Sequence, residues 1–131
     1  MKSRYDIAKE TFDRVFNSTP SQIGGVRIDT PVAQDFYRLC AEHCYADAWS
    51  REEQEGGFDF KMRSLITITC LVAMGITNEL KIHLRTALKL GHEPDDLIEL
   101  FIQILPYAGT PRTIQAMRYL AEILAEEEVQ K

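Results

Sequence analysis

Glu79 and His83 are the two residues in this sequence whose types and spacing best suit acid–base chemistry. They stand four positions apart, so their side chains can meet on one face of a helix. A carboxylate beside an imidazole orients the ring and favours its protonated form. Such a pair can deliver or remove a proton near neutral pH. The pattern alone leaves a second interpretation open, in which the pair belongs to a helix surface and has no catalytic role.

The segment 77–90, which carries this pair, is predicted to be an amphipathic helix. The basic residues on one side of it, expected to face solvent, are Lys81, Arg85 and Lys89. The apolar residues on the opposite side are Leu80, Leu84, Ala87 and Leu88. Glu79 and His83 fall at the flank of the apolar side. Partial burial at this flank is expected to make the titration of the pair sensitive to its surroundings.

Three cysteines, Cys40, Cys44 and Cys70, are the other candidates for chemistry. An odd and sparse set of this kind is not a disulfide framework. Cys40, His43 and Cys44 can share one helix face, but zinc sites usually have a closer C-x2-C pair and a second cluster of ligands. We therefore predict no metal site. The thiols are expected to pack as small buried hydrophobic groups.

Capping and terminating residues divide the chain into six predicted helices. Their expected ranges are 5–16, 31–50, 59–74, 77–90, 94–108 and 111–127. The threonines expected to cap helices are Thr30, Thr77 and Thr110, each followed by a helical pattern. The prolines expected in first turns are Pro31, Pro94 and Pro111, and the glycines expected to end helices are Gly75, Gly91 and Gly109. Segments 17–29 and 51–57 are expected loops, and Pro106 is expected to kink or end the fifth helix.

The organisation of the chain indicates one all-α domain. Its 131 residues, 45% of them hydrophobic, can form a single modest core. There is no internal repeat, no dividing linker and no alternating strand pattern with a hairpin turn. We therefore predict a helical bundle over residues 1–131. Six short amphipathic helices expose much surface relative to their core, so assembly into a homo-oligomer is expected to bury more of it.

Charge and hydropathy disfavour two classes of partner. The net charge is −5 and the lysines and arginines are scattered, whereas binding to nucleic acid needs them concentrated. The longest apolar stretch, 65–74, is too short to span a membrane. The first residues lack the apolar core of a signal peptide, so we expect a cytoplasmic protein.

A longer pattern surrounds the Glu79–His83 pair and continues beyond it. Its residues are Arg63, Ser64, Leu65, Ile66, Thr67, Ala73, Gly75, Glu79, Leu80, His83, Arg85, Ala87, Leu88, Gly91, Gln103, Tyr107, Ala108, Gly109, Pro111 and Ala116, with Asp47, Trp49 and Arg51 upstream. Over about residues 47–116 this pattern resembles the carboxymuconolactone decarboxylase family. No single piece is specific, but the combination of spacings is.

The resemblance implies an all-α fold shared with alkylhydroperoxidase D-like proteins. It also implies a homo-oligomer, a trimer or a hexamer, with pockets at or near subunit contacts. The founding activity of the family is the decarboxylation of 4-carboxymuconolactone to an enol-lactone, without a cofactor, in the breakdown of protocatechuate. We therefore expect a small carboxylated substrate and no cofactor.

Within this resemblance we expect a role for each site residue. We expect His83 to act as the general acid and Glu79 to orient it. Arg63 is expected to grip a substrate carboxylate, because its planar guanidinium suits that group, and a salt bridge inside the bundle is the alternative. Trp49 and Tyr107 are expected to line the pocket, with core packing as the alternative for each.

The residues around His83 also bear on other activities known for the same scaffold. Alkylhydroperoxidase D-like enzymes carry C-x2-C with a histidine four positions after the second cysteine. Counting back from His83 puts those positions at Ile76 and Glu79, so the thiol peroxidase activity is disfavoured. A lactone hydrolase or isomerase using the same pair remains open, as does a non-catalytic oligomeric helical protein.

The chain also departs from the family pattern at three places. The stretch 52–58 is longer and more acidic than the Pro-Gly-Leu often found there. Pro106 stands where an apolar residue is usual, and Arg112 and Thr113 stand where small residues are usual. If these positions border the pocket, we expect a different substrate.

Overall fold

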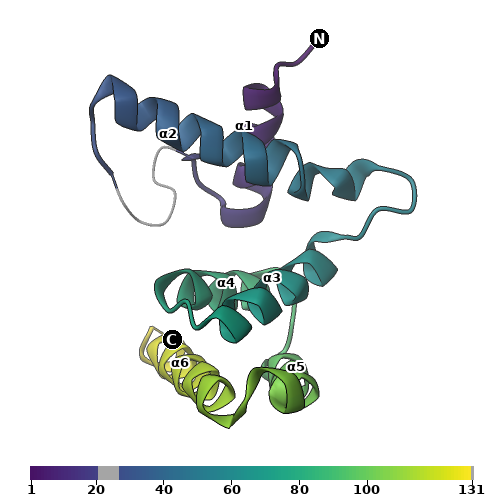
Figure 1. The fold of residues 1–131 in the computed structure, drawn as a ribbon, viewed down its shortest axis with the longest axis vertical. Helices are drawn as coiled ribbons and strands as arrows, with labels where there is room; N and C mark the ends of the chain where they lie inside the picture. The colour runs from purple at the N-terminus through teal and green to yellow at the C-terminus, as the bar shows by residue number, and fades with distance from the viewer. Residues whose placement is uncertain (21–26, 131) are drawn as a thin grey trace. The chain divides into compact units, whose positions relative to one another are not determined.

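The computed structural model describes residues 1–20 and 27–130, and six α-helices account for most of them. In chain order the helices are α1 (Arg4–Phe16), α2 (Pro31–Ala41), α3 (Phe60–Met74), α4 (Asn78–Lys89), α5 (Pro94–Ala108) and α6 (Thr110–Val129) (Figure 1). The described residues contain no strand, so the prediction of an all-α fold is confirmed. Part of the expected loop 17–29 lies outside the described residues.

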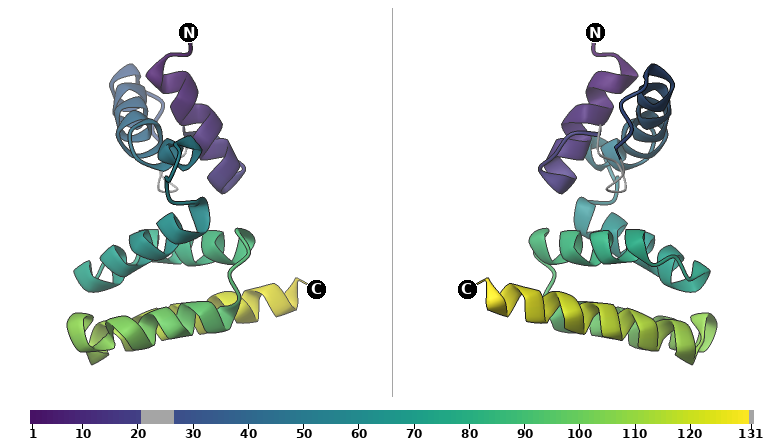
Figure 2. Two further views of the ribbon diagram at one scale, coloured as in Figure 1. Left: turned by 90° about the vertical axis from the view of Figure 1, so that its right-hand side faces the viewer. Right: turned by 90° about the vertical axis from the view of Figure 1, so that its left-hand side faces the viewer.

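The helices form two compact units, Met1–Phe60 and Lys61–Lys131, and each is described by itself. A single domain over 1–131 stays a prediction. In the second unit, α3 and α4 form one layer and α5 and α6 form another (Figure 2). The core between these layers consists of Ile68, Val72, Leu80, Leu84, Ala87, Leu97, Phe101, Ile104, Ala116, Tyr119, Leu120 and Ile123. The three residues of α4 in this core were all expected on its apolar side.

In the first unit an aromatic cluster joins α1 to the segment that follows α2. Tyr45 packs edge-on against Phe12, with ring centroids 4.9 Å apart, and Trp49 lies 6.0 Å from Tyr45 and 5.9 Å from Phe60. Glu42 is buried beside this cluster and binds Arg4 at 3.0 Å and Arg38 at 2.9 Å. The unit is therefore held by ring packing and by a carboxylate shared between two guanidinium groups.

The helix predicted over 31–50 is interrupted. After Ala41 the chain makes a π-helical turn, η2 (Glu42–Ala46), and then a short 3-10 segment, η3 (Trp49–Glu53). The buried stripe runs through positions 37, 41, 45 and 49, and residues four apart in an α-helix drift by about 40° per step. A π turn has more residues per turn than an α-helix, so residues four apart drift in the opposite sense and the turn offsets part of this rotation. The prediction that this helix runs to residue 50 was therefore wrong.

The predicted helix ends are only partly confirmed. Gly75 and Gly91 follow α3 and α4 with positive φ angles of 71° and 107°, and Gly109 caps α5. Pro106 lies inside α5, which continues to Ala108, so it does not end that helix. Two of the predicted threonine caps are wrong. Thr77 precedes α4 with helical backbone angles and makes no capping hydrogen bond, and the residue before α6 is Gly109 rather than Thr110.

The third predicted cap supplies a test. The hydroxyl of Thr30 accepts a hydrogen bond from the backbone N–H of Ala33 at 3.1 Å. We expect Thr30→Ala to lower the free energy of unfolding by about 1 kcal/mol in urea denaturation, because an N–H in the first turn loses its partner. Thr110→Ala is the matched control, since Thr110 makes no side-chain cap. Equal destabilisation by both changes would contradict the assignment.

The expectation of three buried thiols was wrong. Cys44 and Cys70 are exposed and Cys40 is partly exposed. The buried stripe of α3 follows positions 60, 64, 68 and 72, which places position 70 about 200° away from position 68. Cys44 stands one position before the buried Tyr45 and so points away from the stripe described above.

The prediction that the basic side of α4 faces solvent holds only in part. Lys81 and Arg85 are half-buried and pair with Glu122 at 3.8 Å and Glu126 at 3.3 Å on α6, while Lys89 is exposed as expected. These ion pairs are expected to add little stability, because the carboxylates are exposed. Among the residues described, no helix has the length and apolar character needed to cross a bilayer.

Candidate functional site

The first turns of α4 carry the predicted pair and follow a sharp turn at Gly75. Glu79 is exposed in the first turn, where the partial positive charge of the helix N-terminus favours a carboxylate. His83 lies one turn later and is half-buried. The spacing predicted from the sequence therefore does place both groups on α4, one at the surface and one at the edge of the core.

The electrostatic state of His83 differs from the expectation. Burial disfavours the imidazolium and lowers the pKa of His83 to about 4, although the negative charge of Glu79 acts in the opposite direction. The sequence predicted that the carboxylate favours the protonated ring and that partial burial affects its titration, but it did not predict that burial outweighs the carboxylate. In the protein without a bound substrate, His83 is neutral at pH 7. The neutral ring can accept a proton, and a second negative charge close to it would raise its pKa and favour the protonated form.

The remaining predicted residues are distributed over the two units. Arg63 is half-buried near the start of α3, and Tyr107 is 85% exposed near the end of α5, which contradicts core packing for this tyrosine. Trp49 is 7% exposed in the aromatic cluster of the first unit, as its core-packing alternative required. The structure couples Glu79 to His83 through their charges. A pocket role for Arg63, Trp49 or Tyr107 stays a prediction.

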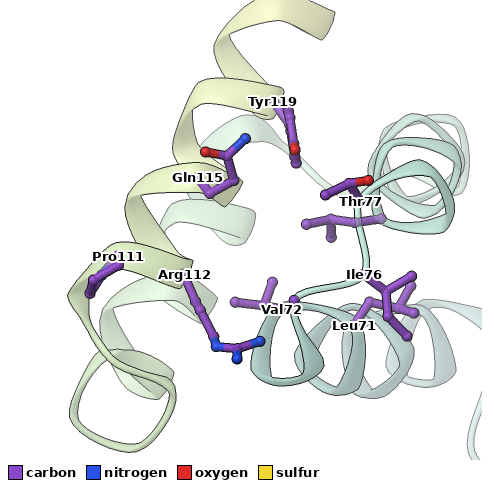
Figure 3. Close-up of a pocket in the computed structure, with 10 residues that line it drawn as sticks. Leu71, Val72, Ile76, Thr77, Pro111, Arg112, Gln115 and Tyr119 are labelled. Carbon is purple, nitrogen blue, oxygen red and sulfur yellow. The ribbon is translucent and has the colours of Figure 1, made fainter.

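A cleft of about 410 Å³ lies beside the turn between α3 and α4, wholly within the second unit (Figure 3). Its walls come from the end of α3, the start of α4 and the start of α6. The apolar residues that line it are Leu71, Val72, Ile76 and Leu80, and the polar ones are Thr77, Arg112, Gln115 and Tyr119, with Gly75 and Pro111 completing it. None of the five predicted site residues lines this cleft.

Sequence reasoning missed the cleft, although signals for it were present. Positions 112, 115 and 119 are spaced by three and four residues, so they form one face of α6. Arg112 was also recognised as a departure from the small residues usual at its position. What the sequence did not show is that this face of α6 meets the turn after α3.

Gly75 allows the close approach of Arg112. It has a φ of +71°, and a Cβ atom at this position would collide with Nη1 of Arg112. Glycine adopts this positive φ without strain, and its missing side chain lets the guanidinium approach. The guanidinium therefore lies over the bare backbone of the turn, at one end of the cleft.

A pair of glycine substitutions tests this packing. Gly56 has a similar φ of +75° but nothing within 4 Å of a built Cβ atom. We expect Gly56→Ala to lower the free energy of unfolding by about 1 kcal/mol through backbone strain alone. Gly75→Ala is expected to lower it by slightly more, because the far end of the flexible Arg112 side chain must also move away. Equal losses in urea denaturation would show that the contact with Arg112 is not tight.

Comparison with known proteins places these features in a family context. Residues 34–122 match the carboxymuconolactone decarboxylase family, a range that includes the whole cleft and all five predicted site residues. The chain is 35% identical over 103 residues to a 4-carboxymuconolactone decarboxylase from Acinetobacter baylyi, covering 75% of this chain and 74% of the relative. It is 30% identical over 92 residues to nitrosuccinic acid decarboxylase npaB from Metarhizium robertsii, covering 70% of this chain and 62% of the relative.

Proposed function

The chain belongs to the carboxymuconolactone decarboxylase family, whose members share the alkylhydroperoxidase D-like fold, and on that premise we propose that it is a carboxy-lyase acting on a small carboxylic acid. The observation that carries the proposal is that two relatives named as decarboxylases each align with at least 70% of the chain. Both alignments are long enough that the proposal does not rest on one motif.

The proposed reaction breaks the bond between the carboxylate carbon and its neighbour. CO2 leaves, and the electron pair moves into a conjugated lactone carbonyl of the substrate. A proton from the imidazolium of His83 then adds to carbon, so that one carboxylate and one proton give CO2 and a C–H bond. Because the electron sink is part of the substrate, the proposed reaction needs no cofactor. Glu79 orients the imidazole and stabilises its charged form.

The low pKa of His83 adds a condition to this scheme. At neutral pH the free protein holds little imidazolium, since the pKa is about 4. An anionic substrate placed near the ring would raise that pKa, as Glu79 already does. We therefore propose that substrate binding and proton uptake by His83 are coupled. The proton needed on carbon would be acquired as the complex forms.

An ultraviolet assay of the purified protein with 4-carboxymuconolactone, combined with measurement of released CO2, tests the proposal. Stoichiometric CO2 and enol-lactone formation would support it. Ring opening without CO2 would identify a lactone hydrolase and overturn it. Nitrosuccinic acid is the second substrate to test, because the Metarhizium relative is named for it and a nitro group is another electron sink. No turnover of either acid would favour a non-catalytic protein.

We also propose that the protein is a homo-oligomer. Each of α2, α3, α5 and α6 exposes apolar residues, a pattern that favours a protein partner. These are Val32, Phe36, Leu39, Met62, Ile66, Met74, Ile102, Leu105, Ile114 and Met117. Light scattering that gives the mass of a single chain would contradict this proposal.

A further inference from the structure

We propose that the cleft between the α3–α4 turn and the start of α6 is a binding site for a small organic monocarboxylate, with Arg112 as its anion-binding residue (Figure 3). A planar guanidinium can donate two parallel hydrogen bonds to one carboxylate. Among the residues that the structure describes, Arg112 is the single charged residue that lines the cleft, and none of the lining residues is a carboxylate. The charge of the cleft therefore fits one anionic group.

The guanidinium of Arg112 is not committed to a protein carboxylate. Within residues 1–20 and 27–130 it makes no hydrogen bond or ion pair. Other arginines of the chain do pair with carboxylates, namely Arg4, Arg14, Arg27, Arg38 and Arg85. The guanidinium instead lies close to Gly75, as described above. Its charge is therefore not neutralised by a protein carboxylate.

Three further polar side chains surround the same space with donor groups. The amide oxygen of Gln115 accepts a hydrogen bond from Arg118 at 3.3 Å, and Figure 3 shows its amide nitrogen on the side nearer Tyr119. Thr77, whose hydroxyl makes no helix cap, and Tyr119 also line the cleft. Hydroxyl and amide N–H groups can complete the hydrogen bonding of a carboxylate or of a carbonyl elsewhere on the ligand.

Charges beyond the lining residues also favour an anion. The ammonium of Lys81 lies 4.6 Å from the centre of the Tyr119 ring and therefore close to the cleft. Its nearest acidic partner is Glu122, at 3.8 Å, so its charge is only partly compensated. The partly compensated charge of Lys81 is thus a second cation near the tyrosine end of the cleft.

The apolar wall of the cleft determines which kind of ligand can bind beside the carboxylate. Leu71, Val72, Ile76 and Leu80 form one side of a cleft of about 410 Å³, which is near the lower end of the size range of small-molecule sites. An aromatic or short aliphatic body fits this wall. A second carboxylate on the ligand would lack a cation among the lining residues.

This inference does not depend on the proposed reaction. Glu79 and His83 are not among the residues that line the cleft, and Glu79 projects about 100° around α4 from its neighbour Leu80, which does line it. Binding in the cleft can therefore be measured without turnover. Either proposal can fail while the other stands.

The test is a titration of the full-length ¹⁵N-labelled protein with benzoate, followed by NMR. We expect saturable shifts at the side-chain amide of Gln115 and at the backbone amides of 75–77. Arg112→Gln is expected to weaken benzoate binding at least about tenfold, because a charge-assisted pair is lost. Arg112→Lys, which keeps the charge but not the planar fork, is expected to bind with intermediate affinity. Arg112 is exposed, so these variants are expected to fold.

Controls separate this site from the Glu79–His83 pair and from general charge effects. Arg85→Gln removes the same charge from outside the cleft and is expected to leave benzoate affinity unchanged. His83→Ala is also expected to leave it unchanged. Benzamide, the neutral analogue, is expected to bind more weakly than benzoate. Absence of saturable binding at millimolar benzoate, equal affinity of the Arg112→Gln variant, or loss of binding in His83→Ala alone would each overturn the proposal.

Discussion

Replacing His83 with alanine is expected to lower kcat/KM for decarboxylation by roughly 100- to 10,000-fold, the range typical of losing a general acid. Under the proposed scheme no other group is assigned to protonate the carbon after CO2 departs. Enol-lactone formation followed by ultraviolet absorbance, together with CO2 release, measures the loss. Far-ultraviolet circular dichroism checks that the helices are intact. Because His83 is neutral and half-buried, the alanine variant is not expected to leave an unpaired charge in the core.

Two further variants distinguish a specific role of His83 in the reaction from a general effect on the protein. Glu79→Gln removes the charge that raises the pKa of His83, so less imidazolium should form and the rate should fall with the ring still present. His43→Ala, which changes an exposed histidine in the first unit, is the matched control and should keep full activity. Full activity of His83→Ala would remove His83 from the reaction. Equal losses in His83→Ala and His43→Ala would point to a general effect on the protein.

Local chemistry explains which parts of the fold were predictable. Gly75 and Gly91 end their helices with positive φ, and Pro31 and Pro94 stand in first turns, because each of these residues restricts its own backbone. Thr30 caps its helix for an equally local reason. Such features need no knowledge of what the helix packs against.

Features that depend on packing were predicted less well. The π turn after Ala41 follows from the need to keep Tyr45 and Trp49 in one aromatic cluster, and that cluster exists only when α1 is in place. The hydroxyl of Thr77 does not cap α4, and its backbone is helical (φ −93°, ψ −54°) rather than extended as a capping residue requires. Lys81 and Arg85 were expected to face solvent, but their neighbours on α6 were not known from the sequence.

In the candidate site, too, the sequence predicted the local feature but not the features that depend on packing. A helical projection was enough to group Glu79 with His83, since both lie on one short helix. It could not decide whether burial or the nearby carboxylate controls the imidazole, because that balance depends on the depth of His83 in the folded chain. The cleft required the meeting of α6 with the α3–α4 turn, which are about 40 residues apart in sequence. The unusual Arg112 and the helical spacing of positions 112, 115 and 119 were the sequence signals for it.

The free energy of unfolding is expected to rise as the pH is raised from about 4 to about 6.5, and His83 should account for a large part of the rise. Its pKa is about 4 in the folded protein and near 6.5 in an unfolded chain. Between these values the unfolded chain binds more protons, so raising the pH favours the folded state. Above pH 6.5 both states hold a neutral ring and this contribution is fully present. As the pH falls towards 4, about 3 kcal/mol of stability is expected to be lost.

Urea denaturation of the parent protein and of His83→Gln at a series of pH values isolates this contribution. Glutamine is polar but does not titrate, so the variant should lose the part of the pH dependence that belongs to His83. His92, which bonds the carbonyl of Lys61 at 2.9 Å, is present in both proteins and cancels in the difference. Parallel curves would mean that the imidazole is not desolvated in the folded protein. In that case the pKa of His83 would stay near 6.5, a sizeable fraction of the imidazole would already be protonated at neutral pH, and proton uptake would no longer need to be coupled to substrate binding.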